Sequence, residues 1–178
     1  MSRVRIVVEP EQLDPDGLRR ELEAEGCGSV VSFVGLTRGD DDGITVKRLE
    51  FDAWEERLPG VLNQLAEQAI GQFGVSSVVL GHRIGSVEPG EPIVCIHVAS
   101  AHRAEGFKAC SCLLDEPQSH PPLWKKEVRS DGELWKSGLG YSDRTDPTHG
   151  AGHVRCTSLY HPPAVALDAL PASPDSLP

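Results

Sequence analysis

Residues 59–100 read PGVLNQLAEQAIGQFGVSSVVLGHRIGSVEPGEPIVCIHVAS, and this stretch decides the fold. Apolar residues recur at helical spacing through 59–73 and a glycine follows them, which predicts a helix. Residues 75–84 and 93–100 are rich in β-branched side chains and predict two strands. Because the connection at 85–90 contains two glycines and a proline, we expect the two strands to form a hairpin.

Upstream of this stretch the sequence predicts three strands and one helix. Residues 3–9 alternate between faces as a strand does, and residues 29–37 form an apolar, β-branched run typical of a buried strand. Between them, Asp14 is a suitable helix N-cap and Gly26 a suitable stop. Residues 45–54 alternate as a half-exposed strand, which we expect to pair with the strand before it.

Downstream, the sequence predicts a helix, a second hairpin and a tail. The helix covers residues 102 to about 115 and is closed by Pro117 together with Pro121 and Pro122, and the hairpin covers 123–136. This mixture of hairpins and helices indicates an α+β fold, not a doubly wound parallel sheet. Residues 138–178 are rich in proline and glycine and poor in large apolar side chains, so we expect a disordered tail after a folded domain of residues 1–137.

The net charge of the 178 residues is −10, from 17 Lys and Arg against 27 Asp and Glu. Such an acidic chain is poorly suited to non-specific binding of nucleic acid or of an anionic membrane surface. No apolar run approaches the roughly 20 residues that span a bilayer, and no signal peptide is recognised, so we expect a cytoplasmic protein. Residues 82–129 hold equal numbers of basic and acidic side chains, and we expect an anion site there.

Five cationic side chains lie at boundaries or alternating positions of predicted elements, where function tends to collect. They are Arg38, His102, Arg103, Lys125 and Lys126. His102 and Arg103 open a helix whose unpaired N–H groups favour an anion, although Arg103 could equally pair with Glu105. Side chains alternate along the strand at 123–129, so only one of the two lysines can face a given pocket.

The tail contains four side chains of the kinds that bind zinc. They are His149, His153, Cys156 and His161. No predicted element orients these donors, so we assign no metal to the chain.

Five segments, taken in order, resemble the large, catalytic subunit of molybdopterin synthase. They are SFVGLTR at 32–38, LEFDAW at 49–54, HRIG at 82–85 with PGE at 89–91, SAHR at 100–103 with Phe107, and PLWKKE at 122–127 with Asp131, Gly132 and Trp135. Their order and spacing hold over nearly the whole predicted domain. The resemblance implies an α/β hammerhead-type fold with an additional small antiparallel β-element.

The resemblance also implies a reaction and its partners. A subunit of this family forms a homodimer and, with two copies of a small ubiquitin-like sulfur carrier, a heterotetramer. The C-terminus of the carrier, as a thiocarboxylate, donates sulfur to cyclic pyranopterin monophosphate, and two transfers give molybdopterin for the molybdenum cofactor. The resemblance implies no cofactor bound to the chain itself.

Position by position, the resemblance makes Lys125 the catalytic residue and leaves Lys126 facing outward. The implied substrate-binding residues are Arg38, His102, Arg103, Lys125 and Gln118. Gln118 stands where the family has a second lysine, and glutamine neither carries charge nor transfers a proton. Lys108 is about 15 Å too far along the same helix to replace that lysine. The alternatives are therefore a catalytically weak member that binds the carrier as an assembly or regulatory module, and an unrelated anion-binding domain.

Overall fold

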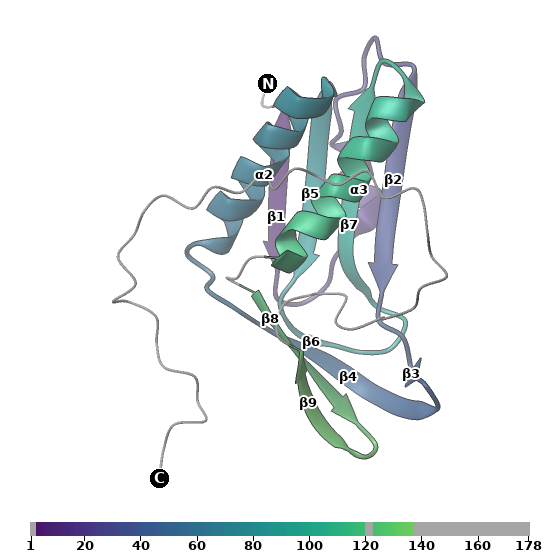
Figure 1. The fold of residues 1–178 in the computed structure, drawn as a ribbon, viewed down its shortest axis with the longest axis vertical. Helices are drawn as coiled ribbons and strands as arrows, with labels where there is room; N and C mark the ends of the chain where they lie inside the picture. Colours follow the sequence, from purple (N-terminus) through teal and green to yellow (C-terminus); the bar gives the residue numbers. More distant parts are fainter. Residues whose placement is uncertain (1–2, 120–122, 137–178) are drawn as a thin grey trace, which may run out of the picture.

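A mixed four-stranded sheet forms the centre of the structure. The structure is a computed structural model that describes residues 3–119 and 123–136. At residues 116–119 and 136 it describes the backbone alone. The strands, in spatial order, are β1 (Val4–Glu9), β5 (Ser77–Arg83), β7 (Pro92–Ser100) and β2 (Ser29–Leu36). β1 runs parallel to β5, and the other neighbours are antiparallel (Figure 1). The predicted central hairpin is present as β5 and β7.

β2 lies at the edge of the main sheet. Its exposed apolar side chains are Val30, Phe33, Val34 and Leu36, so the prediction of a buried strand at 29–37 is wrong. The segment forms a strand because it pairs along its length with β7. A β-branched run indicates such pairing but does not require that both faces be covered.

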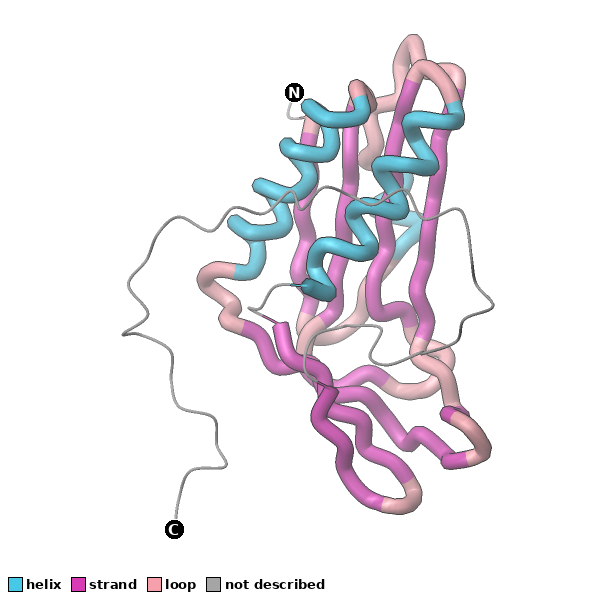
Figure 2. The backbone as a smooth tube through the Cα atoms, viewed as in Figure 1, coloured by secondary structure: helices cyan, strands magenta, loops and turns pink. Residues whose placement is uncertain are grey.

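Helices cover both faces of the main sheet. α2 (Leu58–Phe73) and α3 (Arg103–Ser119) lie side by side on one face, and the short α1 (Pro15–Arg20) lies on the other (Figure 2). The apolar stripe of α2 is buried, and its cap Gly74 has a φ of 66°, a left-handed conformation that suits glycine. At the start of α1, the Gly17 N–H donates to Oδ1 of Asp14 at 2.9 Å, which confirms the predicted N-cap.

Two helices end at residues other than those the sequence predicts. α1 stops well before Gly26, because the N–H groups of Glu21 and Leu22 bond to carbonyls three residues back and tighten the last turn. α3 continues for two residues past Pro117. A proline so close to a helix end disturbs the last turn alone, so it does not stop the helix where the sequence suggests.

A smaller second sheet lies below the first in Figure 1. Its strands, in order, are β3 (Asp40–Asp41), β4 (Ile44–Ala53), β8 (Leu123–Arg129) and β9 (Gly132–Lys136), while β6 (Gly85–Val87) also pairs with β4. β8 and β9 form the predicted hairpin. The expected pairing of residues 45–54 with the strand at 29–37 is wrong, because β4 pairs with β8 and β6. Leu49 and Phe51 on β4 are buried in the core of the main sheet, which fixes the second sheet against it.

Strands and helices are therefore mixed in the α+β manner that the element order predicts. Within residues 3–119 and 123–136, no helix is long and apolar enough to cross a membrane. The predicted disordered tail, residues 138–178, lies outside the described part of the chain.

Candidate anion-binding and catalytic site

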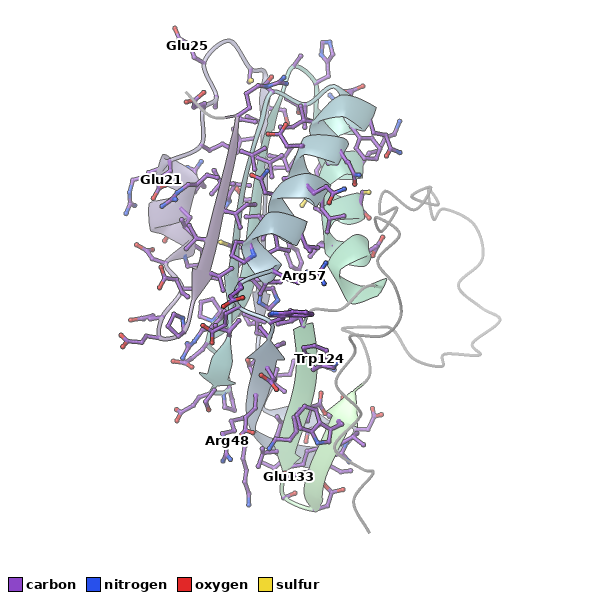
Figure 3. All side chains as sticks on the ribbon, turned by 90° about the vertical axis from the view of Figure 1, so that its left-hand side faces the viewer. Glu21, Glu25, Arg48, Arg57, Trp124 and Glu133 are labelled. Atoms are coloured by element: carbon purple, nitrogen blue, oxygen red, sulfur yellow. The ribbon has the colours of Figure 1, made fainter. Side chains whose placement is uncertain are left out.

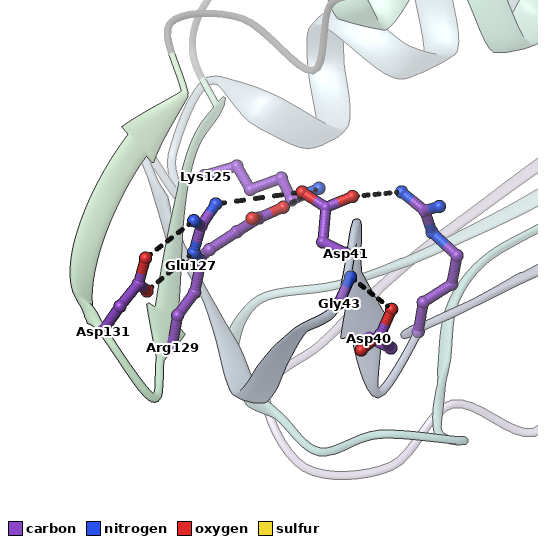
Figure 4. A network of polar contacts seen from close by, with 8 residues as sticks. Asp40, Asp41, Gly43, Lys125, Glu127, Arg129 and Asp131 are labelled. Carbon is purple, nitrogen blue, oxygen red and sulfur yellow. Dashed lines mark hydrogen bonds and ion pairs between the residues drawn. The ribbon is translucent and has the colours of Figure 1, made fainter.

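Lys125 extends from β8 toward the segment that carries Asp41 (Figure 4). Its ammonium Nζ lies 3.1 Å from Oε1 of Glu127, two residues along the same strand. The side chain of Lys125 retains 22% exposure and that of Glu127 only 4%. A buried carboxylate thus holds the ammonium in a fixed place, with less screening by solvent than at an exposed pair.

Arg38 follows the end of β2, where backbone hydrogen bonds set its position. The Thr37 N–H donates to the Glu91 carbonyl at 3.0 Å, and the Gly90 N–H donates to the Thr37 carbonyl at 2.8 Å. The guanidinium of Arg38 donates to Oδ1 of Asp41 at 3.1 Å, while 75% of the Arg38 side chain stays exposed. Its other N–H donors can therefore reach a ligand from solvent.

A second guanidinium, that of Arg129, lies on the other side of Asp41 (Figure 4). Asp131 accepts hydrogen bonds from Nε and NH2 of Arg129 at 3.1 and 3.0 Å. This contact raises the pKa of Arg129 and lowers the pKa of Asp131, so both groups stay charged. Sequence reasoning missed Arg129, although its spacing from Lys125 on a strand already places both side chains on one face.

His102 and Arg103 lie at the other end of α3 from β8. Both side chains are exposed, and the hydroxyl of Ser100 donates to the His102 carbonyl at 2.8 Å. α3 has 17 residues, so about 25 Å of helix separates Arg103 from the end that leads to β8 (Figure 1). Within a single chain, therefore, Arg38 and Lys125 lie in the same region, around Asp41. His102 and Arg103 lie far from that region.

Gln118 is the penultimate residue of α3, and its side chain is not among those described. Three residues of chain separate the end of α3 from the start of β8. The position is thus close to the strand of Lys125, whereas Lys108 lies in the half of α3 toward Arg103.

Lys126 occupies the face of the second sheet opposite to Lys125. Its Nζ lies 2.6 Å from Oε2 of Glu50 and 3.2 Å from Oε2 of Glu133, and 5.5 Å from the ring centre of Trp135. The contact with Glu50 does most to raise the pKa of Lys126, and Lys126 in turn lowers the pKa of Glu50. Figure 3 shows Trp124 and Glu133 on this second sheet, below the helices. Lys126 is thus engaged by carboxylates away from Arg38.

Metal ligands do not gather in the part of the chain that is described: residues 3–119 and 123–136 contain no group of three or more His, Cys, Asp or Glu side chains that could hold an ion. The carboxylates nearest the site, those of Asp41, Glu127 and Asp131, face cations instead. The four candidate zinc donors at residues 149–161 lie outside the described residues.

The fold and the site define a mixed α+β protein with two arginines and a lysine between the end of β2 and β8. The solved structure of molybdopterin synthase from Staphylococcus aureus has a similar fold, with a TM-score of 0.67 and 28% identity over 76% of this chain and 98% of that chain. A complex of subunits 1 and 2 of molybdopterin-converting factor from Helicobacter pylori 26695 contains the same fold, with a TM-score of 0.58 and 20% identity over 75% of this chain and 90% of that chain.

Sequence comparison gives the family. The molybdopterin synthase catalytic subunit of Pyrococcus abyssi is 31% identical over 137 residues, which are 77% of this chain and 93% of that protein. A family profile described as MoaE protein matches residues 8–119. The chain belongs to the MoaE family, which confirms the resemblance seen in its sequence. Its function is that of a molybdopterin synthase catalytic subunit, a sulfurtransferase of molybdenum cofactor biosynthesis.

Proposed function

We propose that this chain transfers sulfur from the thiocarboxylated C-terminus of a small ubiquitin-like carrier to cyclic pyranopterin monophosphate. The ion pair of Lys125 with buried Glu127, in the same region as the exposed Arg38, carries this proposal. Both reactants are anions, and arginine and lysine bind carboxylates and phosphates through charge-assisted hydrogen bonds. Lys125 is the catalytic residue of the proposal, because its Nζ can donate to the reacting anion and exchange a proton with it.

The other substrate-binding residues enter this proposal through a homodimer. His102 and Arg103 are exposed and about 25 Å of helix from β8 of their own chain, so one chain does not supply a complete set of cations. A homodimer in which the start of α3 of one protomer reaches β8 of its partner completes the pocket. Gln118 adds a hydrogen-bonding side chain from the other end of α3.

Mixed dimers test this arrangement. Lys125→Ala and Arg103→Ala homodimers should each be inactive, and exchange of their subunits should restore about a quarter of wild-type turnover. Half of the dimers after exchange contain one chain of each kind, and each of these holds one intact site if the two residues come from different chains. Activity that stays at the level of the separate variants would place both residues in a site of one chain.

The proposed macromolecular partner is the small carrier subunit. The Helicobacter pylori structure holds subunits 1 and 2 of molybdopterin-converting factor in one complex, which supports such a partner here. Within this proposal, residues 1–137 form the domain that acts, residues 138–178 form a disordered tail, and the protein works in the cytoplasm. Formation of molybdopterin by purified protein, thiocarboxylated carrier and cyclic pyranopterin monophosphate tests the reaction directly.

Gln118→Lys should raise turnover by about tenfold or more without tightening carrier binding, if catalysis needs two lysines. The physical reason is that lysine can both carry charge and transfer a proton, and glutamine can do neither. Product formation and the carrier Kd would be measured for both proteins. Gln118→Arg is the matched control, because arginine adds charge and cannot transfer a proton.

The outcomes separate the two candidate functions. A wild-type protein that is already fast, and that Gln118→Lys does not improve, contradicts the requirement for two lysines. Tight carrier binding by both proteins with no turnover by either would support the alternative, a carrier-binding module without catalysis.

A further inference from the structure

We infer that Arg38 and Arg129 together form a two-guanidinium site that binds an anionic group of the substrates. In the absence of substrate the carboxylate of Asp41 occupies this site, and the anionic group displaces it on binding. This inference rests on the proposed sulfur transfer and adds two residues to its site, Arg129 and Asp41. The carboxylate of Asp41 is shared between the two arginines. Its Oδ1 lies 3.1 Å from NH2 of Arg38, and its Oδ2 lies 3.9 Å from NH1 of Arg129.

The two edges of the Arg129 guanidinium have different surroundings. Asp131 holds the edge formed by Nε and NH2 through two parallel hydrogen bonds, which fix the plane of the group. NH1 faces Asp41 at 3.9 Å, a distance too long for a hydrogen bond. The Arg129 side chain is only 15% exposed. Arg129 is therefore oriented before a ligand arrives, and NH1 can bond to an anion that approaches more closely than Asp41 does.

Asp41 is held in a way that allows displacement. It belongs to β3, a strand of two residues, and is followed by Asp42 and Gly43 with φ values of 53° and 82°. The Asp41 side chain is 22% exposed and its hydrogen-bond partner Arg38 is 75% exposed, so solvent and salt reach this ion pair from the side of Arg38. A carboxylate that lies between two guanidinium groups occupies the place of an anionic ligand. A phosphate or a second carboxylate can replace it without any change in the two arginines.

The charge of the site also favours this role for Arg129. Arg129 adds a positive charge on the same face of β8 as Lys125. An arginine is always protonated in proteins, so Arg129 supplies charge and hydrogen bonds but no proton transfer. Its effect is therefore expected on substrate binding.

Binding of inorganic phosphate to the full-length chain tests the site without any turnover. By isothermal titration, Arg129→Met should weaken phosphate binding about tenfold, and Asp41→Asn should strengthen it several-fold because the competing carboxylate is lost. Arg48→Met is the matched control. Arg48 forms the same kind of pair with a carboxylate two residues along its strand, Glu50, at 2.7 Å on the other face of the second sheet. This control should keep the wild-type phosphate affinity.

The two variants are expected to change phosphate affinity in opposite directions, and this difference distinguishes ligand binding from a structural role. If Asp41 and Arg129 only hold β3 against β8, both substitutions should weaken binding. That result would overturn the inference. So would an Arg129→Met protein that binds both phosphate and the peptide described next as tightly as the wild-type protein does.

A second titration identifies the anion. The two sources are the phosphate group of the pterin and the C-terminal carboxylate of the carrier, so a short peptide with a free C-terminal carboxylate is titrated beside phosphate. The site holds the ligand that binds more weakly to the Arg129→Met protein and more tightly to the Asp41→Asn protein. If neither ligand shows these two changes in affinity, the inference is overturned. A protein that shows these responses but never forms product keeps the anion site and contradicts the proposed function instead.

Discussion

Replacing Lys125 by alanine should lower product formation by about 10²–10⁴-fold. Glu127 holds the ammonium of Lys125 at 3.1 Å on the face that Arg38 and Asp41 border. A methyl group in its place can neither donate to the anionic reactants nor exchange a proton with them. Initial rates at saturating carrier and pterin would show a fall in turnover, since the lost interaction acts on the reaction step.

Lys126→Ala is the control from the neighbouring position. The Lys126 side chain lies on the other face of β8 between Glu50 and Glu133. We expect unchanged turnover and a melting temperature lowered by no more than a few degrees, because Glu50 and Glu133 retain 30% and 56% exposure and ion pairs open to solvent contribute little to stability. A larger loss of turnover at Lys126 than at Lys125 would place the reaction on the opposite face of the strand.

The Lys125 variant also needs a control for stability. Removing the ammonium takes a charged partner from the buried carboxylate of Glu127, which we expect to cost about 1–3 kcal/mol of unfolding free energy. The double variant Lys125→Met, Glu127→Gln removes both charges and should recover part of that stability. It should stay inactive, which separates loss of chemistry from loss of fold.

Acidification from pH 7 to pH 4 should lower the unfolding free energy by about 3 kcal/mol through His82 alone. His82 is buried in β5, with Nδ1 2.7 Å from the Arg83 carbonyl and its ring edge-on to Phe51 at 5.4 Å. Burial disfavours the charged ring and lowers the pKa of His82 from 6.5 to about 4, against a smaller opposing effect of the hydrogen bond.

The direction of this pH effect follows from the protons bound in each state. Between pH 6.5 and pH 4 the ring is protonated in the unfolded chain and neutral in the folded one, so stability falls as the pH falls. Above pH 6.5 both forms are neutral and the full stability remains. His82→Gln should flatten this part of the curve of unfolding free energy against pH, measured by urea unfolding. Burial also lowers the pKa of His97, so some slope persists; a slope identical to wild type would contradict the effect of His82.

The parts of the fold that the sequence predicts are those defined by neighbouring residues. The helix α2 follows from apolar spacing, and the β5–β7 and β8–β9 hairpins follow from glycine-containing turns between strand-like runs. Pairing between distant strands leaves no such local pattern. For residues 45–54 the sequence therefore predicts the strand correctly but not its partner, because β4 pairs with β8 and not with β2.

The site shows the same division. The positions of Arg38 at a strand end and of Lys125 on an alternating strand could be predicted from their neighbours in the sequence. The contact of Asp41 with Arg129 joins residues 88 positions apart and depends on how β3 and β8 approach each other. The separation of Arg103 from Lys125 likewise depends on the direction of α3, which composition and spacing do not define.

The antiparallel pairing of β4 with β8 has a consequence for the order in which the protein becomes active. Phe51 and Lys125 are partners in this ladder although they are 74 positions apart in the chain. Closing so long a loop costs entropy, and non-local pairings of this kind form slowly. The main sheet with α2 can form before β8 joins β4, so Lys125 reaches its working position late in folding. Local opening of the second sheet would likewise abolish activity while the main sheet stays folded, and hydrogen exchange at the β8 amides reports that opening separately from global unfolding.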